Sequence, residues 1–483
     1  MYMLGKPDRF DKTIEDTTLK VSDLSKRMLT SQQGKLCVLF IKQLTDRMML
    51  SEFIIKPLME YSSAKHPLPA KELCNQVVCT DDCDIDNDRT RIPEYLLNGL
   101  TVILLSWDED YLIANIKKIE AKNIESPELT YTLRGPRDSF TENLDTNLSL
   151  IRYRIKDKNL KIQLLQVGVR TKAQIAVSYI EDIANGNIVE DILHRIKSLN
   201  IDGVVESGEL QALLLNNKYN IFPQMGLVER SDMACNALLE GKILIICEGS
   251  GLALTAPKTF SEFLTSCDDL YDNKYLALFL KILRSMALFV SFTLGSLYIA
   301  IVSFHTDTLP SEYILKLAML RSNIPFNPII GVLILELLLE ILREALLRVP
   351  KQIGPAIGTA GAIIIGQAAI ASGIFSPLLL IIVSAALLAS FVAPDYTIIN
   401  PFRIFKFLMM LLSSVFGLIG FTMGLCLILT NILSANSFGI AFAAPVAPFD
   451  FRDFIRSFFY DKNVSPQRPH FLKTRDKIRS RRK

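Results

Sequence analysis

The feature that most limits how this 483-residue chain can fold is a series of long apolar runs in its second half. Met286 to Phe304 and Phe407 to Leu433 contain no charged side chain, and neither does Ile353 to Ala393. About 20 apolar residues cross the hydrocarbon core of a bilayer, so the middle run can cross twice, with Pro377 starting its second crossing. These runs predict four membrane-spanning helices in an all-α polytopic domain over residues 275–449.

The segment 332–349, between the runs that end at Phe304 and begin at Ile353, is apolar but carries charges at helical spacing. At about 100° per residue its charged side chains share one face of a helix, while leucines cover the opposite face. These side chains are Glu336, Glu340, Arg343, Glu344 and Arg348. The spacing predicts ion pairs of Glu340 with Arg343 and of Glu344 with Arg348. Since each charge costs about 2.5–3.5 kcal/mol at mid-bilayer, something other than lipid must face them.

Three placements of this amphipathic helix fit the sequence. The helix can lie flat on the membrane surface, cross with its charged face inside a bundle, or line a wet cavity. The flat placement is the simplest of the three. A flat helix leaves four crossings and a crossing helix makes five, so the number of spans stays open at this point.

The middle apolar run contains small residues that recur every fourth position. Its small and polar members are Gly354, Gly358, Thr359, Ala362, Gly366, Gln367 and Ser372. Small residues at this spacing let helices approach closely in lipid, and close packing is the simpler interpretation. The alternative is that several copies of the chain meet here around a narrow pore, with the hydroxyl and amide groups supplying polar lining.

The distribution of charge predicts on which side of a membrane the chain ends lie. Residues 1–274 are acidic in balance, whereas the tail from Phe451 carries eleven Lys and Arg against three Asp. A basic tail favours a cytoplasmic C-terminus. The chain opens with a polar, charged segment rather than a signal peptide, so the N-terminal region is also expected in the cytoplasm and the number of crossings is expected to be even.

The first half of the chain contains a repeated pattern. Leu96 to Ala114 resembles Leu238 to Ala256, and each reads as a helix end, a glycine, an apolar strand, a polar turn and a second strand. Cys37 to Leu58 similarly resembles Lys161 to Ile183, and both predict a β-rich stretch followed by an amphipathic helix. Strands that alternate with helices predict a region of two related α/β subdomains.

The resulting domain plan has five parts. They are an N-terminal arm over 1–29, a first α/β subdomain over 30–132, a linker and second α/β subdomain over 133–274, the transmembrane domain over 275–449 and a basic cytoplasmic tail over 450–483. The link between the subdomains holds an interdomain motif, made of Arg134, Gly135, Pro136, Arg137, Arg152 and Arg154. Its arginines can bind phosphate or lipid, but scattered arginines in an acidic region favour pairing with the acids around them.

Patterns that carry catalysis or metal binding are missing from the sequence. No GxxxxGK[ST], HExxH, GxSxG or strand-following GxGxxG occurs, and the four histidines have no partner at triad or metal spacing. Cys74, Cys79 and Cys83 lie close together, but without a CxxC pair or a neighbouring histidine they favour a polar loop over a metal site. We therefore expect no enzyme activity, no cofactor, no metal and no nucleic-acid partner.

Three stretches of the sequence together resemble one family. They are RGPRDSFTENLDTNLSLIRYRIK from Arg134, IDGVVESGELQALLLNNKYNIFPQ from Ile201 with LLEGKILIICEGS from Leu238, and ELLLEILREALLRVPKQIGPAIGTAGAIIIGQAAIASGIFSPLLLIIVSAALLASFVAPDY from Glu336. In this order the chain resembles the A subunit of the GerA family of bacterial spore germinant receptors. Asp138-Ser139 and Ala345-Leu346 depart from the Glu-Gly and Ala-Gly that are commoner in that family.

The resemblance implies a protein of the spore inner membrane whose N-terminal region of two subdomains is cytoplasmic. It implies two partners, a transporter-like B subunit that binds the nutrient and a lipoprotein C subunit. It also implies a nutrient-gated ion channel built from several A subunits. Our hypothesis is that the charged helix couples the N-terminal subdomains to a pore formed by the small-residue helix. Two alternatives stay open, a non-conducting scaffold for the B and C subunits and a secondary transporter subunit, which would require inverted repeats in the membrane half.

Overall fold

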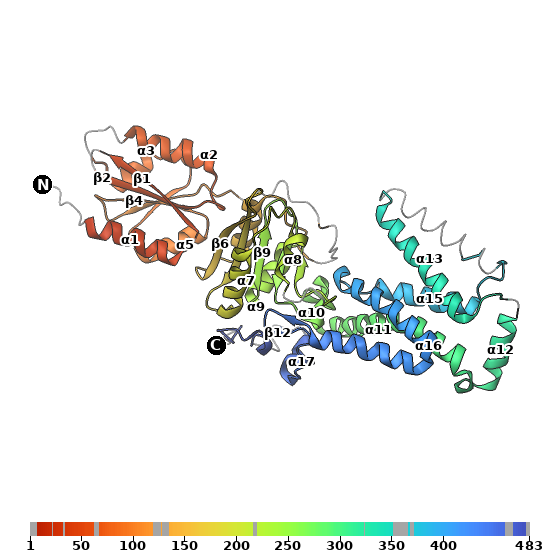
Figure 1. The fold of residues 1–483 in the computed structure, drawn as a ribbon. Coiled ribbons are helices and arrows are strands. Elements are labelled where there is room, and N and C mark those ends of the chain that lie inside the picture. The colour runs from red at the N-terminus through yellow and green to blue at the C-terminus, as the bar shows by residue number, and fades with distance from the viewer. Residues whose placement is uncertain are drawn as a thin grey trace. The chain divides into compact units, whose positions relative to one another are not determined.

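The computed structural model of this chain describes residues 7–21, 23–31, 34–61, 67–118, 127, 135–215, 220–322, 324–350, 366–367, 371–458 and 467–479. The chain forms two compact units. The first, here called the sheet unit, comprises Met1–Asn216, Met225–Pro257 and Ser465–Lys483, and the second, the helical unit, comprises Asn217–Gln224 and Lys258–Val464. The two five-stranded sheets lie in the first unit and the long apolar helices in the second (Figure 1).

The sheet unit contains two five-stranded antiparallel sheets. The first has the strand order β1-β2-β4-β5-β3, built from β1 (Leu24–Ser31), β2 (Gly34–Ile41), β3 (Cys83–Asp86), β4 (Thr101–Leu105) and β5 (Tyr111–Ala114). Its central strands are apolar on both faces, and helices therefore cover both faces. They are α1 (Pro7–Lys20) and α5 (Ile92–Leu97) on one face, and α2 (Arg47–Met49), η1 (Leu50–Ile55), α3 (Lys56–Tyr61) and α4 (Ala70–Gln76) on the other.

Helix α1 is part of this first subdomain. Phe10 and Ile14 of α1 are buried and lie in one apolar cluster with Leu39 of β2. Strand β1 pairs with β2 along its whole length and forms one edge of the sheet. The structure therefore extends the subdomain over most of the segment 1–29, which we expected to be a separate arm, because the apolar side chains of this polar segment complete the core.

The second sheet repeats the first one strand for strand. Its order is β6-β7-β9-β10-β8, built from β6 (Leu160–Val167), β7 (Ala173–Ile180), β8 (Gly226–Val228), β9 (Ile243–Cys247) and β10 (Ala253–Ala256). The register repeats as well, since Thr101 pairs with Ala114 in the first sheet and Ile243 with Ala256 in the second. The accompanying helices are α6 (Leu144–Arg154), α7 (Gly186–Ser198), α8 (Ser207–Leu214) and α9 (Ser231–Glu240).

The repeat predicted for Leu96 to Ala114 and Leu238 to Ala256 is confirmed, because each segment forms a helix end and a β-hairpin. The second predicted pair is shifted by one strand. Cys37 lies in β2, whereas Lys161 lies in β6, which corresponds to β1. Residues of Lys161 to Ile183 form β6, a turn and β7, without the expected helix. The buried run in the middle of β7 pairs with both β6 and β9, so a β-rich apolar segment is used as a central strand.

The helical unit starts with α10 (Phe260–Phe263) and η3 (Cys267–Leu270). Its further helices are α11 (Lys274–Phe304), η4 (Thr306–Thr308), α12 (Ser311–Arg321), α13 (Pro328–Arg348), α15 (Pro377–Ser390), α16 (Tyr396–Ser434) and α17 (Phe451–Phe458), with the two-stranded β11 (Asn436–Ser437) and β12 (Ile440–Ala441) before α17. In the part of the chain that the structure describes, α11 and α16 are long and apolar enough to cross a membrane, by length and composition, and α15 is a shorter apolar helix.

Helix α16 reverses direction at Gly417, and its two halves form a hairpin (Figure 1). Gly417 has φ 60° and ψ −132°, a conformation in which a side chain is strained. Beyond this residue the chain runs back along itself, because a Cβ atom at Gly420 would meet Leu412 and one at Gly424 would meet Met409. The single continuous span expected here is wrong, since hydropathy does not register a turn inside an unbroken apolar run.

The predicted small-residue helix lies largely outside the described residues. Gly354, Gly358, Thr359 and Ala362 all fall there. Gly366 and Gln367 are helical, and a Cβ atom at Gly366 would lie 4.0 Å from Leu380 of α15. Its role in packing or in a pore therefore stays a prediction.

Candidate functional site

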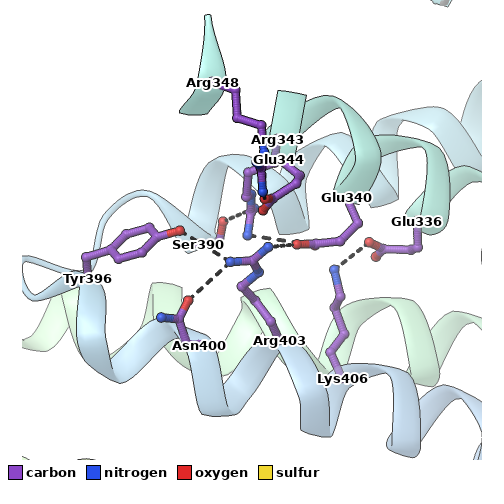
Figure 2. Close-up of polar contacts among 10 residues, drawn as sticks. All are labelled: Glu336, Glu340, Arg343, Glu344, Arg348, Ser390, Tyr396, Asn400, Arg403 and Lys406. Atoms are coloured by element: carbon purple, nitrogen blue, oxygen red, sulfur yellow. Dashed lines mark hydrogen bonds and ion pairs between the residues drawn. The ribbon is translucent and has the colours of Figure 1, made fainter. Parts of the chain in front are cut away.

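Helix α13 is held between α11 and α15 by its apolar face. Asn327 caps the first turn by accepting a backbone hydrogen bond. Val332 and Leu335 are buried in one cluster with Tyr298 of α11 and Val383 of α15. This packing turns the charged face of α13 toward α16, as Figure 2 shows.

The deepest charge on this face is Glu336, which pairs with Lys406 of α16. The Lys406 Nζ atom donates to Glu336 Oε2 over 2.6 Å, and the two residues are 3% and 8% exposed. Glu336 Oε1 has no hydrogen-bond partner among the described residues, and a Cβ atom at Gly295 of α11 would lie 3.4 Å from it. The glycine thus leaves space for a carboxylate of α13 that lies beside α11 and α16.

One turn further along α13, Glu340 forms an ion pair with Arg403 of α16. Arg403 also donates to the Asn400 side chain over 3.1 Å and to the Tyr396 hydroxyl over 3.3 Å. These contacts fix the planar guanidinium group, whose five N–H donors suit several acceptors at once. Glu340 also lies 4.0 Å from Arg343 on its own helix, as the spacing predicted.

Arg343 extends the contacts to α15. Its Nη2 atom donates to the Ser390 hydroxyl over 2.7 Å, and its guanidinium carbon lies 5.1 Å from the centre of the Phe391 ring. The other predicted pair, Glu344 with Arg348, also forms at 2.8 Å, but it is exposed. Figure 2 shows Arg343, Ser390, Glu344 and Arg348 together with the pairs of Glu336 and Glu340.

We call the five charged residues that join the helices the ion-pair network. It consists of Glu336, Glu340, Arg343, Arg403 and Lys406, and so holds three cations and two carboxylates. Removing charges from water is costly unless they are paired and hydrogen-bonded, and such groups in apolar helices commonly mark functional sites. The charged face of α13 contacts α16 and α15. How α13 lies relative to a membrane stays a prediction.

Sequence reasoning missed the two cations on α16. Arg403 and Lys406 lie 63 and 70 residues from their partners, so no helical spacing links them. A signal was present, because they are the only charges in the otherwise apolar Tyr396–Ser434. Two isolated cations in an apolar helix require carboxylates from elsewhere.

The interdomain motif forms ion pairs rather than an open basic patch. Arg152 of α6 is fully buried and binds both carboxylate oxygens of Asp23 at 2.8 and 2.6 Å, as well as the carbonyl oxygens of Asp157 and Leu160. Arg154 pairs with Asp138 at 2.8 Å. The predicted pairing with surrounding acids is therefore confirmed for both arginines.

The other members of that motif contribute less. Gly135 and Pro136 are half-buried and Arg137 is exposed, while Arg134 lies outside the described residues. The fixed part of the motif is thus the helix α6, whose arginines hold it to Asp23 on one side and to Asp138 on the other.

The cysteine cluster has the geometry of a hydrogen-bonded loop. The Cys74 thiol donates to the Cys83 carbonyl oxygen over 3.1 Å. Burial, followed by contact with Cys74, raises the pKa of the Cys83 thiol well above its usual range. The polar-loop interpretation of Cys74, Cys79 and Cys83 stays a prediction.

The fold and the ion-pair network define a two-unit protein that joins a duplicated α/β part to an apolar helical part with internal charges. A family model described as "Bacillus/Clostridium GerA spore germination protein" matches residues 12–470. The chain therefore belongs to the GerA family of spore germination proteins. The membership expected from the sequence motifs is confirmed.

Individual relatives agree over most of the chain. The chain is 34% identical to spore germination protein B1 of Bacillus subtilis (strain 168), over 85% of either chain. It is 31% identical to spore germination protein KA of the same organism, over 92% of this chain and 82% of the relative. It is also 31% identical to spore germination protein GerLA of Bacillus cereus, over 96% of this chain and 95% of the relative.

One solved structure is similar to the N-terminal part. It is the crystal structure of the N-terminal domain of the A subunit of the Bacillus megaterium spore germinant receptor GerK3. The match has a TM-score of 0.40 and 23% sequence identity, and it covers 52% of this chain and 93% of that chain.

Proposed function

We propose that this chain is the A subunit of a nutrient germinant receptor in the spore inner membrane, where several copies form a nutrient-gated ion channel. Membership of the GerA family and the names of its relatives support the receptor role. The two membrane-capable helices support a membrane location. A transporter-like B subunit that binds the nutrient and a lipoprotein C subunit are the proposed partners, and the sheet unit faces the cytoplasm.

The ion-pair network is the observation that carries the channel mechanism. Glu336 and Lys406 are buried together in an apolar helical unit, and Arg343 links the same cluster to α15. Apolar side chains would hold the helices together at lower electrostatic cost, so the presence of a charge cluster suits an element that can adopt two packing arrangements. In the proposed mechanism, α13 is the coupling helix, and its shift against α16 moves the neighbouring small-residue helix that lines the pore.

The test compares Arg343→Ala with Arg348→Ala in spores whose only copy of this chain is the variant. Both changes remove one guanidinium group from α13, but Arg343 belongs to the network and Arg348 lies in an exposed pair. Coupling free energies of about 1–3 kcal/mol correspond to changes of roughly 5- to 150-fold, so Arg343→Ala should alter the rate of nutrient-triggered potassium release at least about fivefold. Release should be unchanged for Arg348→Ala.

A normal response of Arg343→Ala spores that contain normal amounts of the chain would refute the coupling role. Gly366→Leu then tests the pore. Leak without nutrient, or blocked release with the receptor assembled, supports a conducting helix at this position.

The alternatives give different results. If release from Gly366→Leu spores is unchanged and the purified oligomer does not conduct ions in liposomes, the chain is a scaffold for the B and C subunits. A secondary transporter subunit would instead accumulate substrate in liposomes along an ion gradient. Secondary transporters commonly contain repeats in their membrane part, whereas the duplication in this chain lies in the sheet unit. The channel is therefore better supported than the transporter.

A further inference from the structure

The C-terminal segment 467–479 folds against the second subdomain of the sheet unit. Gln467 and Ile478 form an antiparallel bridge that closes the segment, with the short helix η5 (His470–Leu472) between them. Leu472 and Thr474 are 1% and 5% exposed. The segment is therefore a packed part of this unit.

Its backbone hydrogen bonds go to the turn that follows β7. Arg475 N donates to the carbonyl oxygen of Ile183 over 3.0 Å, and Asp476 N donates to that of Asp182 over 3.1 Å. The turn between α9 and β9 lies beside it, because a Cβ atom at Gly241 would be 2.5 Å from the Thr474 side chain. A side chain at position 241 would thus displace the segment.

The first subdomain has the same contact in the same place, made by a different part of the chain. Lys118 N donates to the carbonyl oxygen of Leu44 over 3.0 Å, in the turn that follows β2. Gly99, between α5 and β4, lies beside Lys117, just as Gly241 lies beside Thr474. Since β2 corresponds to β7 and β4 to β9, residues 117–118 correspond to residues 474–475.

The two subdomains differ in where the chain goes after the last hairpin strand. After β5, which ends at Ala114, the chain turns directly to residues 117–118 and completes the first subdomain. After β10, which ends at Ala256, the chain passes Pro257 and enters the helical unit. It returns to the sheet unit only at Ser465.

We propose that the C-terminal segment 467–479 is the missing last piece of the second subdomain, and that residues 258–464 are an insertion within this subdomain. The binding surface is the pair of turns around Ile183 and Gly241, and its partner is the chain's own C-terminal segment. Residues 258–464 are consequently attached at both ends to one subdomain, whereas the first subdomain is closed by local residues.

Side chains add specificity to this contact. Arg468 donates from Nε to the Leu239 carbonyl oxygen over 2.9 Å and pairs with Asp476 within the segment at 3.0 Å. Arg479 lies 3.5 Å from Glu240 at the end of α9. Arg468 and Arg479 of the tail thus bind the end of α9, and they are not available to a membrane surface.

Hydrogen–deuterium exchange of the full-length chain in detergent tests the proposal. Arg475→Pro removes the N–H group that binds Ile183, and Arg475→Ala keeps it. We expect amides in residues 181–186 and 239–243 to exchange about tenfold faster or more in the proline variant, and less so in the alanine variant. The equivalent turns of the first subdomain, residues 42–46 and 98–100, should exchange as in the unchanged chain.

A second variant keeps the test independent of the proline. A chain that ends at residue 466 should show the same local increase, while a chain that ends at 479 should behave like the full-length protein. Unchanged exchange at 181–186 and 239–243 in both altered chains would overturn the proposal. An increase of equal size in both subdomains would overturn it too, because the segment would then support the whole unit rather than complete one repeat.

Discussion

Lys406 on α16 and Glu336 on α13 form an ion pair of 2.6 Å although 70 residues separate them. Both side chains are almost completely removed from solvent. Truncation of one partner leaves the other charge buried and unpaired, which typically costs about 3–5 kcal/mol. We therefore expect Glu336→Ala and Lys406→Ala each to lower the unfolding temperature of the purified chain in detergent markedly.

The double variant Glu336→Leu/Lys406→Met provides the control. It replaces both charges by apolar side chains of similar volume, and such replacements are often neutral or stabilising. Stability close to that of the unchanged chain would show that the cost in the single variants is that of an unpaired charge. A loss equal to the sum of two single losses would contradict this interpretation.

Arg152 should be irreplaceable by lysine. Its guanidinium group is fully buried and binds Asp23 through two nitrogen atoms. An ammonium group cannot reproduce this fork, so Arg152→Lys should destabilise the sheet unit by about 2–3 kcal/mol in denaturant unfolding. Arg47→Ala removes an exposed partner of Asp145 on the same helix and should change stability by less than about 0.5 kcal/mol.

Stability should depend on pH through Asp395. Burial alone would raise the pKa of this carboxyl group, but the charge of Lys258, 2.6 Å away, together with hydrogen bonds from Lys258 and Thr397, outweighs burial and places the pKa below its ordinary value of 3.8. The carboxylate therefore stabilises the fold at all pH values above about 3.8, and this contribution is lost as the pH falls through the lowered pKa.

The variant Asp395→Asn isolates this contribution. At neutral pH it should be less stable than the unchanged chain by about 2 kcal/mol, and the difference should shrink as the pH falls below 4. Unfolding curves of both chains between pH 7 and pH 3 measure it. A difference that is constant over this range would mean that the charge of Asp395 contributes nothing.

Alanine substitutions at Gly417 and Gly439 distinguish the cost of backbone strain from the cost of steric crowding. Both have positive φ, 60° and 82°, but a Cβ atom at Gly417 would lie 3.0 Å from Phe304 and one at Gly439 meets nothing within 4 Å. Gly439→Ala should therefore cost about 1 kcal/mol from strain alone, and Gly417→Ala should cost roughly 1–2 kcal/mol more. Equal losses in thermal unfolding would argue against close packing at the α16 turn.

Thiol labelling should discriminate among the cysteines. Burial raises the pKa of the Cys235 thiol to about 12, whereas Cys79 is exposed. Maleimides react with thiolates, so at pH 8 the folded chain should be modified at Cys79 long before Cys235. Mass spectrometry of digested samples gives the order, and labelling in denaturant should remove the difference. Early modification of Cys235 in the folded chain would show that α9 is not packed as described.

Features that depend on neighbours in sequence were the ones that could be predicted. The helix–glycine–hairpin pattern around Gly99 and Gly241 and the pair of Glu340 with Arg343 are set within a few residues. The partners of Glu336 and Glu340 on α16 could not be predicted, because they depend on how distant helices pack. The helix expected in place of β7 is wrong for the same reason. A short apolar segment can form a strand or a helix, and its packing neighbours decide which.

The reversal of α16 at Gly417 has a consequence for counting membrane passages. Phe402 near its start and Ile432 near its end lie in the same apolar cluster, so the helix begins and ends at one end of the helical unit. Hydropathy counts this apolar run as one crossing. A hairpin, however, returns the chain to the side of the membrane on which it started. Labels placed just before Tyr396 and just after Ser434 must report the same side, whatever number of helices precedes them.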